Sequence, residues 1–209
     1  MVEGGKIDWG CHSNDAATVF QEVIDLDEAV KVAYEFYRQH PEETLILITA
    51  DHETGGIALG AGSTELHFDL LKNQRQSAEA FSRIIAAQHQ SEGDRFTWDF
   101  VRQQLKEHFG FWSQIPLDEK DTARLKKAYE EFCEGVAKDT RTLYASENVI
   151  AGTARKLMAR KAMVSWQSNE HSNGYVPVFA IGAGAEKFTG RIDNTEIPRK
   201  IAEAAGYDL

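Results

Sequence analysis

The sequence predicts an α/β fold in which helices flank a mainly parallel sheet and a block of helices is inserted. Two strand-like runs, 44–50 and 175–182, each adjoin a stretch with helical apolar periodicity, and this alternation is typical of the class. Between them, residues 63–162 show helical periodicity. We therefore predict an α/β core formed by residues 1–62 and 163–209, interrupted by a helical insertion at 63–162.

The first core segment is predicted to contain a strand, a helix and a second strand. Residues 1–8 are interpreted as the end of a strand, and Asp25–His40 as an amphipathic helix that Asp25 or Asp27 caps. The run Thr44–Ala50 has apolar residues on both faces, which is typical of a buried parallel strand. These elements make up a βαβ unit.

The insertion is predicted to contain long helices, each with an apolar stripe and a polar face. It is interpreted either as a lid over a site or as a packing subdomain. Its cluster of basic residues is expected to be a solvated helix face. The predicted helices are Ala78–Gln88, Phe96–Phe111, Asp118–Lys138 and Asn148–Met163, and the basic quartet is Arg155, Lys156, Arg160 and Lys161.

The last core segment is predicted to be a strand followed by a helix. Tyr175–Gly182 has strand composition and carries Pro177, which favours an edge position or an irregular entry. Asn194 or Thr195 is expected to cap a final helix that runs to about residue 205.

Composition excludes several classes of function. A net charge of −10 and a pI of about 5.2 argue against a general nucleic-acid surface and favour cations or small ligands as partners. The longest apolar runs are too short to span a bilayer. Cys11 and Cys133 do not indicate a disulfide framework. The opening MVEGG lacks the basic and apolar segments of a signal peptide.

Carboxylate and imidazole groups, which together are typical zinc ligands, lie in separate short motifs. Asp8 and His12 are four residues apart, so on a helix they would face the same side; a surface pair is the alternative reading. Asp51 and His52 follow directly after the strand at 44–50, where α/β sheets place their chemistry. For this second pair, a simple turn with an Asx-type hydrogen bond is the alternative.

The other histidines carry less information. His171 lies in a stretch rich in Asn, Ser and Gly, where a histidine is more often exposed than ligating. Cys11 adjoins His12, but neighbouring side chains seldom reach one ion. No role is assigned to His40, His67, His89 or His108.

Taken together, three motifs resemble the C-terminal half of a bacterial alkaline phosphatase. They are MVEGGKIDWGCHSNDA, TADHETGG and EHSNGYVPVFAIGAGAEKFTGRIDNTEI, in that order. The likeness covers residues 1–62 and about 163–206, and the helical block corresponds to the variable insertion region of that family. The order of the three motifs is more specific than any one of them.

The resemblance implies two zinc ions and one magnesium ion in the full active site. In that family a serine attacks the phosphorus of a phosphate monoester, and a zinc-bound hydroxide hydrolyses the phosphoseryl intermediate. By position, Asp8, His12 and His171 match ligands of the first zinc, Asp51 and His52 match ligands of the second zinc, and Glu3 matches a magnesium ligand.

The same resemblance implies the partners of the parent protein. These are small phosphate monoesters and the N-terminal half of the same protein, with a homodimer as a further option. Neither nucleic acid nor a membrane span is expected, and the parent protein is expected in the periplasm or outside the cell.

Two departures from the family pattern limit what can be carried over. The chain contains no Asp-Ser dipeptide, which holds the nucleophile in the family, and Ser13, Ser168 and Ser172 are interpreted as loop and capping residues. No catalytic residue is therefore assigned, and the chain is expected to be inactive alone. Trp9 stands where some relatives place His or Lys, and it brings no positive charge. The alternatives are a related phosphodiesterase or sulfatase, or a non-catalytic metal-binding or interaction domain.

Overall fold

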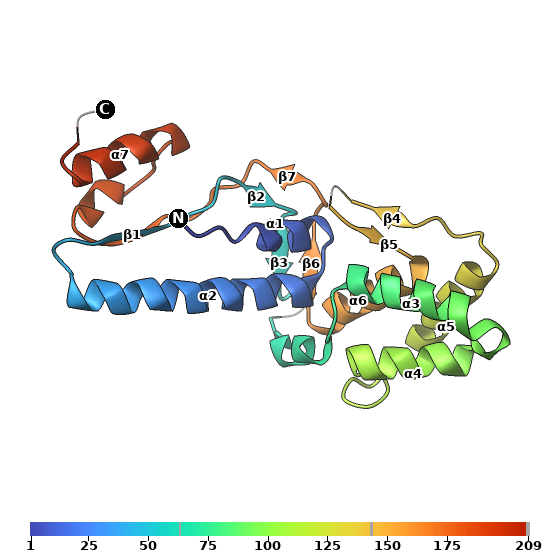
Figure 1. Ribbon diagram of the computed structural model, residues 1–209. Helices are drawn as coiled ribbons and strands as arrows, with labels where there is room; N and C mark the ends of the chain where they lie inside the picture. The colour runs from blue at the N-terminus through green and yellow to red at the C-terminus, as the bar shows by residue number, and fades with distance from the viewer. Residues whose placement is uncertain (63, 143, 208–209) are drawn as a thin grey trace. The chain divides into compact units, whose positions relative to one another are not determined.

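The computed structural model describes residues 1–62, 64–142 and 144–207 (Figure 1). The helices are α1 (Gly5–His12), α2 (Ala16–Gln39), α3 (Ala78–Glu92), α4 (Trp98–Phe109), α5 (Glu119–Cys133), α6 (Val149–Lys161) and α7 (Ile197–Ala204). The strands are β1 (Leu45–Ile48), β2 (Glu53–Thr54), β3 (Ile57–Leu59), β4 (Thr140–Arg141), β5 (Ser146–Glu147), β6 (Val164–Trp166), β7 (His171–Ser172) and β8 (Phe179–Gly182). Short 3₁₀ turns are η1 (Phe68–Asn73), η2 (Gly93–Arg95), η3 (Ala185–Phe188) and η4 (Asn194–Glu196). Among these described residues, no helix is long and apolar enough to cross a membrane.

The chain forms two compact units, which are described separately. Unit 1 comprises residues 1–2 and 23–53 and the described part of 171–209, and unit 2 comprises residues 3–22 and 54–170. The division falls inside α2 and inside β2. It groups residues differently from the predicted division at 62 and 162, which stays a prediction.

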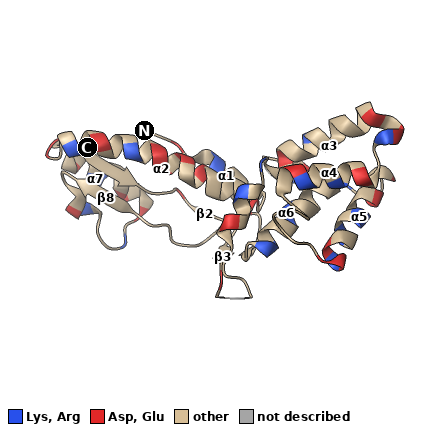
Figure 2. Cartoon of the chain, turned by 90° about the horizontal axis from the view of Figure 1, so that it is seen from below, with Lys and Arg blue, Asp and Glu red and all other residues tan. Residues whose placement is uncertain are grey.

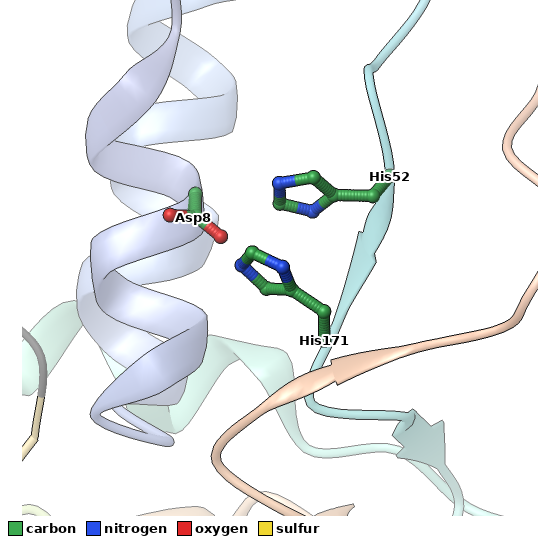
Figure 3. A group of neighbouring side chains, drawn as sticks. All are labelled: Asp8, His52 and His171. Atoms are coloured by element: carbon green, nitrogen blue, oxygen red, sulfur yellow. The ribbon is translucent and has the colours of Figure 1, made fainter.

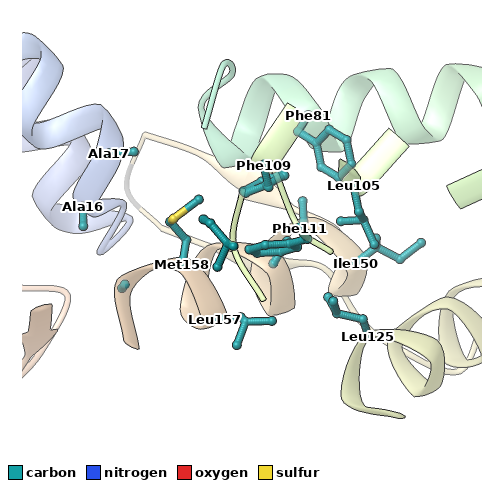
Figure 4. Packing of buried hydrophobic residues seen from close by; sticks show 14 of the residues in the cluster. Ala16, Ala17, Phe81, Leu105, Phe109, Phe111, Leu125, Ile150, Leu157 and Met158 are labelled. Carbon is teal, nitrogen blue, oxygen red and sulfur yellow. The ribbon is translucent and has the colours of Figure 1, made fainter. Parts of the chain in front are cut away.

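The core of unit 2 is formed mainly by the helices predicted for the insertion. Five fully buried residues meet in this core: Phe81 of α3, Leu105 and Phe109 of α4, Phe111 in the segment after α4, and Ile150 of α6 (Figure 4). The rings of Phe81 and Phe109 meet edge to face, with centroids 5.0 Å apart. Burial of each such side chain contributes about 2–3 kcal/mol of hydrophobic free energy. All four predicted helices of the block are confirmed.

Side-chain caps explain where these helices begin. The side chains of four residues each accept a hydrogen bond from the backbone N–H three residues later, which satisfies an N–H group that has no partner within its helix. The capping residues are Ser77 of α3, Thr97 of α4, Asp118 of α5 and Asn148 of α6.

The outer faces of these helices carry charges of both signs. Figure 2 shows Lys and Arg interspersed with Asp and Glu along α3, α4 and α5. On α5, Lys127 lies 3.4 Å from Glu131 one turn later, an arrangement that stabilises a helix by a few tenths of a kcal/mol. These are the solvated faces that the sequence predicts.

One buried carboxylate connects α5 with α6. Asp121 of α5 is 2% exposed and forms ion pairs with Arg160 and with Lys161, whose Nζ lies 2.8 Å from its Oδ2. Burial by itself would raise the pKa of Asp121, but the hydrogen bonds and charges of Lys161 and Arg160 outweigh it and hold that pKa below its usual range.

We expect Asp121→Asn to lower the free energy of unfolding by about 2 kcal/mol at neutral pH, because two cations lose their carboxylate partner. Since the folded pKa of Asp121 is lowered, its contribution is complete above the ordinary aspartate pKa and is lost as pH falls through the folded value. Urea denaturation at neutral pH and at acid pH measures both effects. Equal stability of the two proteins at neutral pH would contradict this expectation.

The N-terminal segment differs from its prediction. Residues 1–8 do not form the end of a strand, because α1 occupies Gly5–His12. The helix packs closely against α2, where a Cβ added to Gly10 would lie only 2.9 Å from Cγ2 of Val19. This packing depends on contacts between helices, which strand periodicity does not report.

The start of α2 also differs from its prediction. The helix begins at Ala16, so neither Asp25 nor Asp27 caps it. Asp15 takes that place, since its Oδ1 accepts a hydrogen bond of 3.2 Å from the Thr18 backbone N–H. The apolar stripe of the helix extends back to Ala16. The sequence pattern did not predict this first turn, because the polar residues Ser-Asn-Asp precede it directly.

In unit 1, β1 pairs with β8 in the antiparallel sense, with Leu45 opposite Gly182 and Ile48 opposite Phe179. Both strands were predicted. The prediction that the strand at 44–50 is parallel is wrong for this pairing, because β1 runs antiparallel to β8. Strand periodicity does not specify direction, because a long connection can return in either sense. The α/β class itself is confirmed, since helices and strands alternate in both core segments.

Unit 1 exposes several large apolar side chains. Strand β1 is only half-buried along its length. The final helix α7 begins at Ile197 and has no side-chain cap, so neither Asn194 nor Thr195 caps it. Asp193 instead caps the preceding 3₁₀ turn η4 through a capping box with Glu196. Large apolar residues exposed in this unit include Val23, Ile24, Val32, Tyr34, Phe36, Phe179, Ile181 and Ile201.

Candidate metal centre

Helix α1 places Asp8 and His12 on one face, one turn apart. Oδ1 of Asp8 lies 3.4 Å from Nε2 of His12. The His12 ring is buried, and its Nδ1 lies 2.7 Å from the backbone carbonyl oxygen of Asn169. A carbonyl oxygen can only accept, so Nδ1 carries a proton and donates it.

This hydrogen bond determines what the rest of the ring presents. With a proton on Nδ1, Nε2 is the ring nitrogen that faces the Asp8 carboxylate. Two electron-pair donors at this separation repel each other unless a proton or a cation lies between them. The pair therefore fits a metal ion, and the contact of Nδ1 with a carbonyl is the usual orienting contact of a zinc-bound histidine.

Asp8 is held from a second direction by Thr54. The Thr54 hydroxyl is buried and donates a hydrogen bond of 2.5 Å to Oδ1 of Asp8. Gly55 follows, and its N–H donates to the carbonyl of Glu170 at 2.9 Å. Within unit 2, these bonds connect the segment at Thr54 and Gly55 with Asp8 of α1 and with Glu170.

A second cluster lies in unit 1. The rings of His52 and His171 stack with centroids 3.6 Å apart, and Figure 3 shows these two rings. Oδ2 of Asp51 lies 3.3 Å from Nε2 of His52. Strands β2 and β7 pair, and the Ser172 hydroxyl donates a hydrogen bond to the Glu53 carboxylate.

The chain itself links the two clusters. Thr54, the hydrogen-bond partner of Asp8, is two residues after His52, and Asn169, the partner of His12, is two residues before His171. Successive Cα atoms are about 3.8 Å apart. Each of these short segments therefore carries a candidate ligand and a residue that orients a ligand of the other cluster.

The structure thus brings together Asp8 with His12, Asp51 with His52, and His52 with His171. Glu3 is exposed just before α1. Asp51 is also exposed, with 84% of its side chain open to solvent. The assignment of these residues to particular ions stays a prediction.

Sequence reasoning missed the residues that orient the candidate ligands. Thr54 lies inside the motif TADHETGG, and its hydroxyl, a possible hydrogen-bond donor to a ligand, is visible in the sequence. Asn169 acts through its backbone, which side-chain patterns do not report. Tyr144 of the insertion stacks on Trp9 with centroids 5.1 Å apart and meets the ring of His12 edge-on at 5.4 Å.

The expectation that the basic quartet forms a solvated face is wrong for Arg155. This residue is only 6% exposed, and its Nε lies 3.0 Å from Oε2 of the buried Glu147. Its guanidinium also donates to the Asn14 carbonyl at 3.2 Å. Ala151 and Met158 lie about one turn from Arg155 and are buried, so Arg155 lies on the inward face of α6. A buried acidic partner balances its charge there.

Comparison with known proteins agrees with the motif order. A sequence model of the alkaline phosphatase family matches residues 1–207. The chain belongs to the alkaline phosphatase family. Similar members include two proteins of Bacillus subtilis, alkaline phosphatase 4, with 33% identity over 94% of this chain, and alkaline phosphatase 3, with 30% identity over 100% of it.

Solved structures of alkaline phosphatases share the fold. The cold-active alkaline phosphatase of a psychrophilic Shewanella matches with a TM-score of 0.74 and 26% identity over 100% of this chain. The Thermus thermophilus alkaline phosphatase matches with a TM-score of 0.67 and 26% identity over 100% of it. The α/β fold is therefore that of alkaline phosphatases.

The chain spans less than half of the proteins that it resembles. It covers 37% and 40% of the two Bacillus subtilis proteins, and 45% and 43% of the two structures. Family membership is established for these residues.

Proposed function

We propose that this chain is the metal-holding part of an alkaline phosphatase that hydrolyses phosphate monoesters with two zinc ions and one magnesium ion. The observation that carries the proposal is the pair Asp8 and His12, in which the ring is fixed through Nδ1 and its Nε2 lies 3.4 Å from a carboxylate oxygen. Family membership supports the same reading.

In the proposal each residue has a distinct task. Asp8, His12 and His171 hold the first zinc, which is the side of the leaving oxygen, and three protein ligands leave one position open there. Asp51 and His52 hold the second zinc, and Glu3 contributes to the magnesium site. When bound, the zinc ions stabilise the oxygens that enter and leave phosphorus and lower the pKa of the nucleophile.

Other residues position these ligands. Asn169 fixes the His12 ring through its carbonyl, and Thr54 fixes the Asp8 carboxylate through its hydroxyl. The nucleophilic serine is supplied by the N-terminal half of the parent protein, since these residues contain no Asp-Ser dipeptide. The parent protein is proposed to act in the periplasm or outside the cell.

We expect the 209-residue protein to bind zinc and to leave p-nitrophenyl phosphate unhydrolysed, with hydrolysis appearing when the N-terminal half is added. The physical reason is that the metal ligands and the nucleophile lie on different parts of the chain. The measurement is release of p-nitrophenol with and without the N-terminal half.

The matched control is an N-terminal half in which the serine of the Asp-Ser motif is replaced by alanine. Robust hydrolysis by the 209 residues alone would contradict the proposal. So would a reconstituted protein that cleaves a phosphodiester or a sulfate ester in preference to the monoester.

A further inference from the structure

A cavity of about 610 Å³ lies within unit 2, directly beside His12. Helix α6 forms one wall, and the turn after α1 and the segment around Ser168 form others. His12 and Asn169, the pair that orients the candidate zinc ligand, both line it. The cavity therefore adjoins the residue that is proposed to hold the first zinc.

The lining of this cavity is strongly biased in charge. Of the described residues that line it, three are Lys or Arg and none is Asp or Glu, although the whole chain has 33 acidic residues and 23 basic ones. Hydroxyl groups add hydrogen-bond donors to the wall, among them Ser13, Thr142 and Ser165. A wall of cations and hydroxyls without carboxylates is suited to an anion.

The three cations differ in how far their charges are already balanced. Arg155 is paired with the buried Glu147, and Arg160 is paired with Asp121. Lys156 is exposed, and among the described residues no carboxylate lies within ion-pair distance of it. Lys156 is therefore the cation that can pair with an incoming anion without giving up a partner.

The size and the apolar part of the lining indicate how large the bound group is. A volume of about 610 Å³ is much larger than a phosphate ion and falls within the usual range for small-molecule sites. Met163 and Trp166 contribute apolar surface. The cavity thus fits a carbon skeleton that carries an anionic group.

We infer that this cavity receives the leaving group of the substrate, and that Lys156 pairs with a second anionic group on it. The inference rests on the proposed function, in which His12 lies on the side of the leaving oxygen. The preferred substrates are then phosphate monoesters whose alcohol part carries another phosphate, such as sugar bisphosphates, rather than monoesters of neutral alcohols.

The first test needs neither zinc nor turnover. Metal-free 209-residue protein is titrated with inorganic phosphate at low ionic strength by calorimetry. Lys156→Met is expected to weaken phosphate binding about threefold to tenfold, because one charged contact is lost, and Lys156→Arg is expected to restore it. The matched control is Lys106→Met, which removes an exposed charge on α4 away from the cavity. Equal binding by the Lys156→Met and wild-type proteins would overturn the inference.

The second test concerns the substrate. In the reconstituted enzyme, the ratio of kcat/KM for glucose 1,6-bisphosphate to that for glucose 1-phosphate is expected to fall about threefold to tenfold in Lys156→Met and to stay constant in Lys106→Met. An unchanged ratio in Lys156→Met would overturn the assignment of substrate. The two tests can also give different answers. If Lys156→Met loses phosphate binding but the reconstituted wild-type enzyme hydrolyses no monoester, the cavity is supported as an anion site and the proposed function is rejected.

Discussion

Replacing His12 by alanine is expected to weaken zinc binding by at least about 100-fold. The substitution removes a ligand whose ring is already oriented, and loss of an orienting contact alone costs about 10-fold to 100-fold in metal affinity. The Nδ1 contact with the Asn169 carbonyl, at 2.7 Å, is the reason for expecting such a large effect. Competition between the 209-residue protein and a chromophoric chelator at neutral pH measures the zinc affinity.

Two further variants make this test specific. His40→Ala serves as the matched control, because His40 is exposed near the end of α2, and its ring packs against Phe36. Thr54→Val removes the hydroxyl that holds Asp8 and keeps the ligand itself, so an intermediate loss of about tenfold is expected. If His12→Ala and His40→Ala bind zinc equally well, His12 is not a ligand.

The second large effect is expected on stability. Glu147→Gln should lower the free energy of unfolding by about 3 kcal/mol, because it leaves the charge of the buried Arg155 without its balancing carboxylate. Urea denaturation at neutral pH measures the difference. The control is Glu131→Gln, which breaks the exposed pair with Lys127 and should cost less than about 1 kcal/mol. Similar losses in the two variants would contradict the expectation.

The same carboxylate predicts a dependence on pH. Burial raises the pKa of Glu147, although the charge and hydrogen bond of Arg155 act in the opposite direction. The folded protein therefore holds this proton more tightly than the unfolded chain does. The contribution of Glu147 to stability falls as pH rises from the ordinary glutamate pKa to the raised folded value, and it is constant above that range. Glu147→Gln should remove this slope.

The helices of the insertion were predictable from the sequence because their signals are local. Apolar residues recur at helical spacing, and Ser77, Thr97, Asp118 and Asn148 each precede such a stretch as caps. Helix α1 was not predictable in this way. Its packing through Gly10 against Val19 is a contact between helices, and local periodicity does not report it.

The candidate ligands were more predictable than their surroundings. Asp8 and His12 have helical spacing, and α1 uses it. The orienting carbonyl of Asn169 belongs to the backbone, 157 residues away in sequence from the ring that it contacts. Arg155 and Glu147 are eight residues apart, and only the packing of α6 decides that both are buried.

The half-buried strand β1 also affects how the protein behaves in solution. Leu45–Ile48 is a continuous aliphatic run with high strand propensity, and such segments promote aggregation when they are exposed. Glu42 and Glu43 precede this run and Asp51 follows it, and all three are exposed. Their like charges act as gatekeepers against self-association at neutral pH.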